Sequence, residues 1–219
     1  MSVDEIQIPE YTRKQEVFNA LSHFLGIFVA IFVFIFGLNK LINNETSIGI
    51  FVGLTIFAIS MFLVYAISSI YHYTYKDHRY KKVLRVLDHC TIYLLIAGTY
   101  TPICVVLMQS QTIGLVMLII QWVGALIGII LKAFFFTTKW TRIVAFFLYI
   151  VMGWLVLFIG AFVYLEFLPF MFILAGGIAY TIGAVLYALG HKKLGFHCIF
   201  HVFVLASTIL QTVGVLLMI

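Results

Sequence analysis

Long apolar runs separated by short polar connections set the pattern of this chain. Each run is close to the roughly 20 residues that a helix needs to cross the hydrocarbon core of a bilayer. The runs are continuous rather than alternating, which is typical of membrane helices and not of a membrane β-barrel. We therefore predict an all-α integral membrane protein, a bundle of seven transmembrane helices. The expected spans are residues 18–38, 48–74, 86–107, 113–133, 142–164, 168–189 and 196–219.

The segment before the first span is short and polar. Residues 1–16 include four acidic side chains and no apolar run, which is not the pattern of a cleavable signal peptide. We interpret these residues as a polar cytoplasmic arm, with an interfacial helix from about Glu10 to Asn19. Residues 17–219 then form one membrane domain, because no linker or internal repeat marks a second one.

Composition agrees with the membrane assignment. Of the 219 residues, 64% are hydrophobic and 10% are charged, whereas soluble domains carry about 25% charged residues. The net charge of +5 does not indicate nucleic-acid binding, because the basic residues lie in short connections and no soluble domain presents them. The three cysteines form no spaced framework, so we expect no structural disulfide. We expect a multi-pass protein of the cell membrane whose partners are membrane lipids.

The basic residues also predict the orientation. They lie in the N-terminal arm and in the connections after the second, fourth and sixth spans, and only Lys40 lies on the other side. Cytoplasmic loops carry the excess of Lys and Arg in membrane proteins. We therefore expect a cytoplasmic N-terminus and an extracytoplasmic C-terminus, as an odd number of spans requires.

Four polar side chains occupy a similar depth near the inner face. His72 ends the second span, Asp88 opens the third, and His197 and His201 lie four residues apart at the start of the last. Residues four apart on a helix share one face. With a rise of about 1.5 Å per residue, these positions lie roughly 5–12 Å inside the inner boundary. Ionisable groups at such depths are costly and mark candidate functional sites.

Three imidazoles with an open fourth position form the ligand set of a catalytic zinc site. Imidazole also suits iron, copper and nickel, so the pattern alone does not select the metal. A bound metal polarises water toward hydroxide near neutral pH. Asp88 could orient that water, act as its base or hold a ligand histidine. Ser68, one turn before His72 on the same face, could hydrogen-bond the water, a substrate carbonyl or a ligand ring.

Each of these residues has an ordinary alternative. A histidine at a membrane interface is commonly just an amphipathic side chain. Asp88 could pair with Arg85 or cap the third helix. The Ser68 hydroxyl could bond to a carbonyl of its own helix, as serines in membrane spans commonly do.

The other histidines have other expected roles. His78 and His191 are interpreted as loop residues, and His89 as packing against a neighbouring helix. His23 could be a fourth ligand, a proton relay or an interior residue that is hydrogen-bonded to Asn19, and we favour the last. Cys198 points away from the face of the two histidines, so we do not expect it to be a ligand.

These motifs together resemble those of the hemolysin III and progestin/adiponectin receptor family. Residues 68–72 are similar to its S-x3-H motif in the second span, and residues 197–201 are similar to its H-x3-H motif in the last span. Residues 87–102 are similar to its third-span signature. The likeness also touches residues 19–23, 153–154 and 176–187, so it covers nearly the whole chain. The chain is identified as similar to the bacterial branch of this family.

The resemblance implies a seven-helix bundle with a cytoplasmic N-terminus and a zinc ion near the inner face. It implies that His72, His197 and His201 hold the zinc, that Asp88 lies near the metal-bound water, and that Ser68 is the motif serine. The wider superfamily includes alkaline ceramidases, which implies a membrane hydrolase of lipid amide or ester bonds, or a regulator of lipid homeostasis. Bacterial relatives often carry an acidic residue after the first histidine of the last motif. Cys198 stands there in this chain, so that outer carboxylate is missing.

Two further functions remain open from the sequence. The metal could be purely structural, in a non-enzymatic membrane receptor or regulator. The family name also suggests a pore-forming cytolysin, although no span shows a continuous polar stripe that would line a pore.

Overall fold

The chain folds into a bundle of helices in which six of the seven predicted spans correspond to one long helix each. The computed structural model describes residues 5–78, 80–189 and 195–219. Within these residues every regular element is helical, which confirms the all-α class. The elements are α1 (Arg13–Ile42), α2 (Ile48–Tyr73), α3 (Lys81–Met108), α4 (Ile113–Phe135), α5 (Lys139–Gly153), α6 (Leu155–Phe158), the 3₁₀ helix η2 (Ala161–Tyr164), α7 (Phe167–Leu189) and α8 (Gly195–Leu216).

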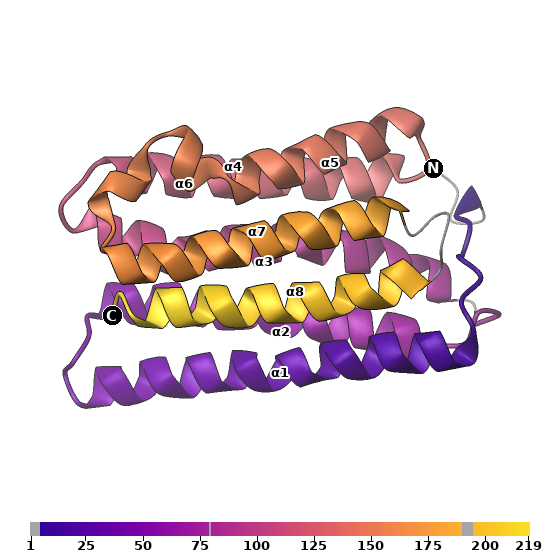
Figure 1. The fold of residues 1–219 in the computed structure, drawn as a ribbon, viewed down its shortest axis with the longest axis horizontal. Coiled ribbons are helices and arrows are strands. Elements are labelled where there is room, and N and C mark those ends of the chain that lie inside the picture. Colours follow the sequence, from indigo (N-terminus) through magenta and orange to yellow (C-terminus); the bar gives the residue numbers. More distant parts are fainter. Residues whose placement is uncertain (1–4, 79, 190–194) are drawn as a thin grey trace.

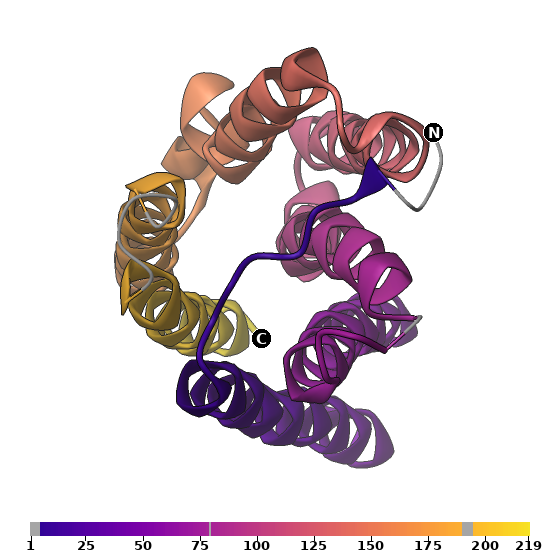
Figure 2. The ribbon, with the colours of Figure 1, turned by 90° about the vertical axis from the view of Figure 1, so that its right-hand side faces the viewer.

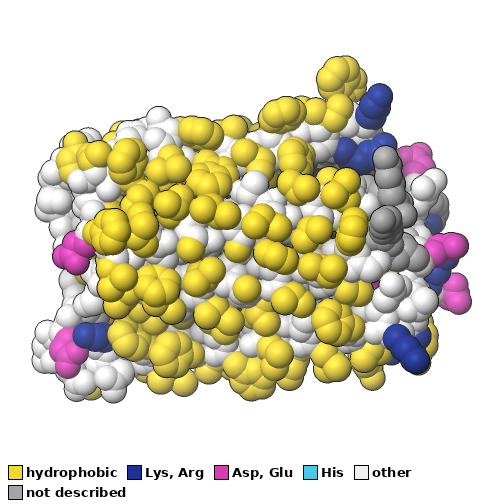
Figure 3. All heavy atoms as spheres, in the orientation of Figure 1, with side chains coloured by type: hydrophobic (Ala, Val, Ile, Leu, Met, Phe, Trp, Pro, Cys, Tyr) yellow, Lys and Arg dark blue, Asp and Glu magenta, His cyan; other side chains and the backbone are white. Residues whose placement is uncertain are grey.

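Six helices in the described part of the chain are long and apolar enough to cross a membrane, namely α1, α2, α3, α4, α7 and α8. Hydrophobic side chains cover the broad side of the bundle, while the charged side chains gather at its two ends (Figure 3). A surface of this kind is stable against lipid and not against water. The protein is therefore a multi-pass membrane protein.

The fifth predicted span differs from the sequence expectation. Instead of one helix over residues 142–164, the chain forms α5, the single turn α6 and η2. The helix α5 ends at Gly153 because the next residue, Trp154, leaves the helical conformation, with φ of −103° and ψ of 9°. The indole Nε1 of Trp154 donates to Thr181 Oγ1 of α7 at 3.1 Å. Gly160 adopts a left-handed conformation with φ of 69°, which a glycine reaches without steric cost. The apolar pattern carries no sign of either break.

The helices form a ring, seen along the bundle in Figure 2. Neighbours along the chain pack against each other in the pairs α1–α2, α2–α3, α3–α4 and α7–α8, and α1 also contacts α8. Because consecutive long helices alternate in direction, α1, α3, α5 and α8 begin at the same end of the bundle (Figure 1). We call it the basic end, because Arg13, Lys76, Lys81, Lys132 and Lys139 lie there.

The segment before α1 crosses the basic end of the ring (Figure 2). Residues 6–12 are not helical, and the side chain of Ile6 is buried. The expected interfacial helix near residues 10–19 is therefore not a separate element. Instead, α1 begins at Arg13, where Thr12 and Gln15 form a capping box that satisfies the first backbone N–H groups.

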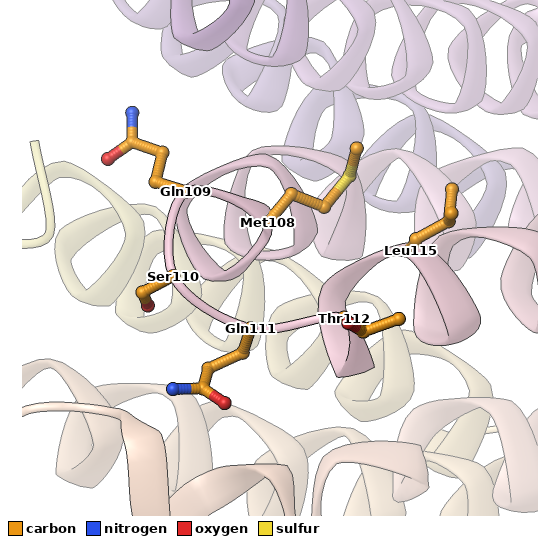
Figure 4. A pocket seen from close by; sticks show the side chains of 6 residues that line it. All are labelled: Met108, Gln109, Ser110, Gln111, Thr112 and Leu115. Carbon is orange, nitrogen blue, oxygen red and sulfur yellow. The ribbon is translucent and has the colours of Figure 1, made fainter.

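A shallow pocket lies at the opposite end, in the connection between α3 and α4. Its lining comes from one short stretch, Met108 to Thr112 with Leu115, and the side chains of Gln109 and Gln111 point to opposite sides of the loop (Figure 4). Because these side chains do not converge on one point, the pocket offers no constellation for chemistry.

Candidate metal centre

The three histidines singled out in the sequence meet inside the basic end. His72 comes from the last turn of α2, and His197 and His201 from the first turns of α8. Each offers one ring nitrogen, and these three nitrogens lie within 4.8 Å of one another. Nε2 of His197 and Nε2 of His201 are 3.0 Å apart. All three side chains are buried.

This arrangement can hold a metal ion. Three nitrogens at 2.0–2.1 Å from one tetrahedral ion would be about 3.3 Å apart, which is close to the spacing of the cluster. Nε2 of His72 is buried and has no hydrogen-bond partner. A buried ring nitrogen without a partner is costly, and a metal ion would satisfy it. Among the residues that the structure describes, this is the one group of three or more His, Cys, Asp or Glu side chains that lie close enough together to bind a metal ion.

Local sequence explains why the rings converge. His197 and His201 are one helical turn apart, so their rings project from the same face of α8. The helix α2 ends directly after His72, because Thr74 turns to an extended conformation and its hydroxyl donates to the carbonyl of Ile70 at 2.6 Å. The ring centroids of His72 and His201 are 4.6 Å apart.

Asp88 and Ser68 lie beside each other and are not part of the group of three histidines. The Asp88 side chain is partly buried on α3 and lies beside Ser68 of α2. It forms no ion pair with Arg85 or another described cation, and Tyr80, not Asp88, occupies the N-cap position of α3. Ser68 Oγ is buried and makes no hydrogen bond of regular geometry, so it does not bond back to its own helix. The Ser68 hydroxyl therefore retains unused hydrogen-bonding capacity beside the Asp88 carboxylate.

The prediction for His23 is wrong. Both ring nitrogens of His23 and both polar side-chain atoms of Asn19 are buried without hydrogen-bond partners, so the two residues are not bonded to each other. The ring of His23 instead lies against His201, with centroids 4.0 Å apart, and meets Tyr65 edge-on at 5.2 Å. Residues 19 and 23 share a buried face of α1, and on that face His23 packs against side chains of α2 and α8.

The remaining histidines lie outside the cluster. His89 packs between helices as expected: it contacts Phe136 edge-on, its Nδ1 is 2.8 Å from the Arg85 carbonyl and its Nε2 is 3.0 Å from Tyr187 Oη. His78 is exposed in the α2–α3 connection. His191 lies outside the described residues, and Cys198 is only partly buried.

Two charged residues at the cluster were missed by the sequence analysis. Glu16 Oε2 is 2.5 Å from Nδ1 of His72, and Glu16 Oε1 is 2.8 Å from Nζ of Lys81. From the sequence, Glu16 is expected in the polar arm and Lys81 in the basic connection after the second span. A signal did exist, because residues 16, 19 and 23 are spaced to share one helical face and all three are buried.

The segment before α1 covers the cluster. The ring of Tyr11 stacks on the ring of His197, with centroids 4.7 Å apart and an interplanar angle of 14°. Burial raises the pKa of Tyr11, so its phenol stays neutral. The segment is fastened by an ion pair of 2.9 Å between Glu10 and Lys76 and by a hydrogen bond from Arg13 to the carbonyl of Tyr73. The Lys76 ammonium holds the pKa of Glu10 below its usual range.

Comparisons with known proteins assign the family. A family model described as "Haemolysin-III related" matches residues 11–212. A "Hemolysin-3 homolog" of Bacillus subtilis (strain 168) is 38% identical over 201 residues, which cover 90% of this chain and 91% of the relative. A "Hemolysin-3" of Bacillus cereus is 35% identical over 198 residues, covering 89% and 87% of the two chains. This chain therefore belongs to the haemolysin-III-related family of membrane proteins.

Proposed function

We propose that this protein is a zinc-dependent membrane hydrolase that cleaves the amide or ester bond of a lipid. The observation that carries the proposal is the buried cluster of His72, His197 and His201. Three neutral imidazoles and an open position are the ligands of many catalytic zinc sites. The resemblance to a superfamily that includes alkaline ceramidases supports the substrate class.

The proposed topology has seven crossings with the basic end in the cytoplasm. The helix α4 ends at the basic end and α7 begins at the opposite end, so α5, α6 and η2 must together return across the bundle. The fifth crossing is thus broken rather than absent in this proposal. The basic residues gathered at one end support a cytoplasmic position for that end.

The chemistry would be divided among a few side chains. A zinc ion held by the three histidines would lower the pKa of its bound water to about 7. The Asp88 carboxylate would accept a proton at one of its oxygens and return it to the leaving group, as a general acid–base catalyst does. The Ser68 hydroxyl, which makes no regular hydrogen bond in the resting site, would donate to the substrate carbonyl oxygen.

Asp88→Asn is expected to separate hydrolysis from metal binding. The variant keeps the three ring nitrogens but loses the proton acceptor, so turnover should fall about 10²- to 10⁴-fold while metal content stays at the wild-type level. Fatty-acid release from a fluorescent ceramide and a fluorescent acyl ester in mixed micelles measures turnover, and mass spectrometry measures metal. Asp77→Asn, an exposed acidic residue in the α2–α3 connection, is the matched control.

A structural role for the metal is the second candidate, and the contacts of the cluster favour it. The ligands tie α2 to α8, while Glu16 and Tyr11 join α1 and the segment before it to the same group. A zinc-bearing wild type that cleaves neither substrate, yet loses thermal stability when its metal is removed, would support this role and contradict the hydrolase. Unchanged turnover in Asp88→Asn would contradict the role assigned to that residue.

Tyr11→Ala is expected to expose the metal to chelators. Removing the ring that stacks on His197 opens the basic end, and stacked aromatic pairs contribute about 0.5–1.5 kcal/mol. Loss of metal to excess EDTA should therefore become about two- to tenfold faster. The measurement is the rate of metal release followed with a zinc-sensitive dye. Trp140→Ala removes an exposed aromatic at the same end and should leave the rate unchanged.

A further inference from the structure

Two buried charged side chains, one from α3 and one from α1, connect to the histidine cluster. Lys81 opens α3 and is fully buried, and its Nζ contacts one carboxylate oxygen of Glu16. The other carboxylate oxygen contacts Nδ1 of His72. We propose that Glu16, held in place by Lys81, is a positioning residue that fixes the tautomer of His72 and directs its Nε2 toward the metal. This inference rests on the proposed metal site.

Lys81 fixes the position of Glu16. Its ammonium has three N–H donors, and three acceptors surround it: Glu16 Oε1 at 2.8 Å, the Tyr71 carbonyl at 2.6 Å and the Thr74 carbonyl at 2.8 Å. The two carbonyls belong to the end of α2, where backbone acceptors lack helical partners. Lys81 therefore caps α2 in the turn that carries His72 and at the same time anchors the carboxylate.

The carboxylate then decides which nitrogen of His72 carries the proton. An ionised carboxylate has only acceptors, so Nδ1 of His72 must donate to Glu16. A neutral imidazole has one ring proton, which leaves the lone pair on Nε2. That nitrogen is buried and has no hydrogen-bond partner. Carboxylates hydrogen-bonded to metal-ligating histidines orient the ring and raise its basicity in other metal sites.

Comparison with neighbouring groups separates this role from an ordinary ion pair. Glu10 and Lys76 form a similar pair at 2.9 Å, but both side chains are exposed. Nδ1 of His201 is buried and has no hydrogen-bond partner. The Glu16 carboxylate thus contacts His72 and not His201. It provides from α1 an acidic group next to the proposed ligands, whereas Cys198 occupies the position in α8 where bacterial relatives often carry one.

Two double variants isolate the acceptor at position 16. Glu16→Gln with Lys81→Met keeps an amide oxygen that can accept from His72, whereas Glu16→Met with Lys81→Met has none. Both lack the charges and the cap on α2, so a purely structural ion pair predicts equal behaviour. The proposal predicts that the Met/Met protein binds Co²⁺ roughly 10- to 100-fold more weakly than the Gln/Met protein. Titration of the metal-free proteins with Co²⁺, followed by visible absorption, gives the affinity for Co²⁺. The absorption spectrum of the bound ion reports the strength and geometry of its ligands.

The outcomes are distinguishable. Equal Co²⁺ affinities and identical spectra for the two double variants would overturn the role of Glu16. A wild type that binds no Co²⁺ would instead overturn the proposed metal site. If either double variant fails to fold, the single variant Glu16→Gln provides the test. Its amide oxygen would accept from Lys81, so its NH₂ group would face Nδ1 of His72 and could not accept from it. The same loss of Co²⁺ affinity and a changed absorption spectrum are then expected. An unchanged spectrum in that variant would contradict the proposal, and Glu10→Gln is its control.

Discussion

Replacing His201 by alanine is expected to leave the purified protein without the metal ion that we propose at the histidine cluster. The residue is 1% exposed, and its Nε2 lies 3.0 Å from that of His197, so the substitution removes one of the three ring nitrogens that the cluster gathers. Removing an outer partner of a metal ligand already weakens binding roughly 10- to 100-fold, so losing the ligand itself should exceed that range. Metal content should fall from one ion per chain to background.

The measurement is the metal-to-protein ratio after purification in metal-controlled buffer. His78→Ala is the matched control, because it removes an exposed imidazole from the same end of the bundle and should keep the ion. A wild-type metal content in His201→Ala would contradict the assignment of this residue as a ligand. Equal loss in His78→Ala would show that the metal binds nonspecifically to surface imidazoles.

The positions of the three histidines could be predicted because depth follows from simple arithmetic. The apolar runs fix where each span begins and ends, the basic connections identify one end, and the helical rise converts residue number into depth. His72, His197 and His201 therefore fall at one level before any contact is known. The apolar runs also predict the ends of the six long apolar helices to within about five residues.

Other features depend on how helices rotate and pack, which the apolar pattern does not encode. Glu16 looked like part of a solvated arm, because the start of α1 depends on the Thr12 capping box and on contacts with α2 and α3. Lys81 counted only as a basic loop residue, although burial at the end of α2 gives it three acceptors. His23 and Asn19 were paired along one helix, whereas packing brings His23 to His201.

Gly26→Ala is expected to destabilise the bundle next to the candidate metal centre. A Cβ at this position of α1 would lie 2.4–2.5 Å from ring atoms of Tyr65. That ring is fully buried, and its hydroxyl donates to Thr208 Oγ1 of α8 at 2.6 Å, so it cannot move aside without losing the link between α2 and α8. Overpacking of this kind costs about 1–3 kcal/mol.

Gly153→Ala is the matched control, because it is expected to leave the free energy of unfolding unchanged or to raise it. A Cβ there has no neighbour within 4 Å, so the substitution should be neutral or should gain up to about 1 kcal/mol from helix propensity. Thermal unfolding in detergent compares the two variants, at about 2–4 °C per kcal/mol for a chain of this size. If Gly26→Ala unfolds at the same temperature as Gly153→Ala, the tight contact between Gly26 and Tyr65 is not a determinant of stability. A lower unfolding temperature together with faster metal loss would show that the packing of α1 on Tyr65 supports the histidine cluster, because His23 lies between Tyr65 and His201.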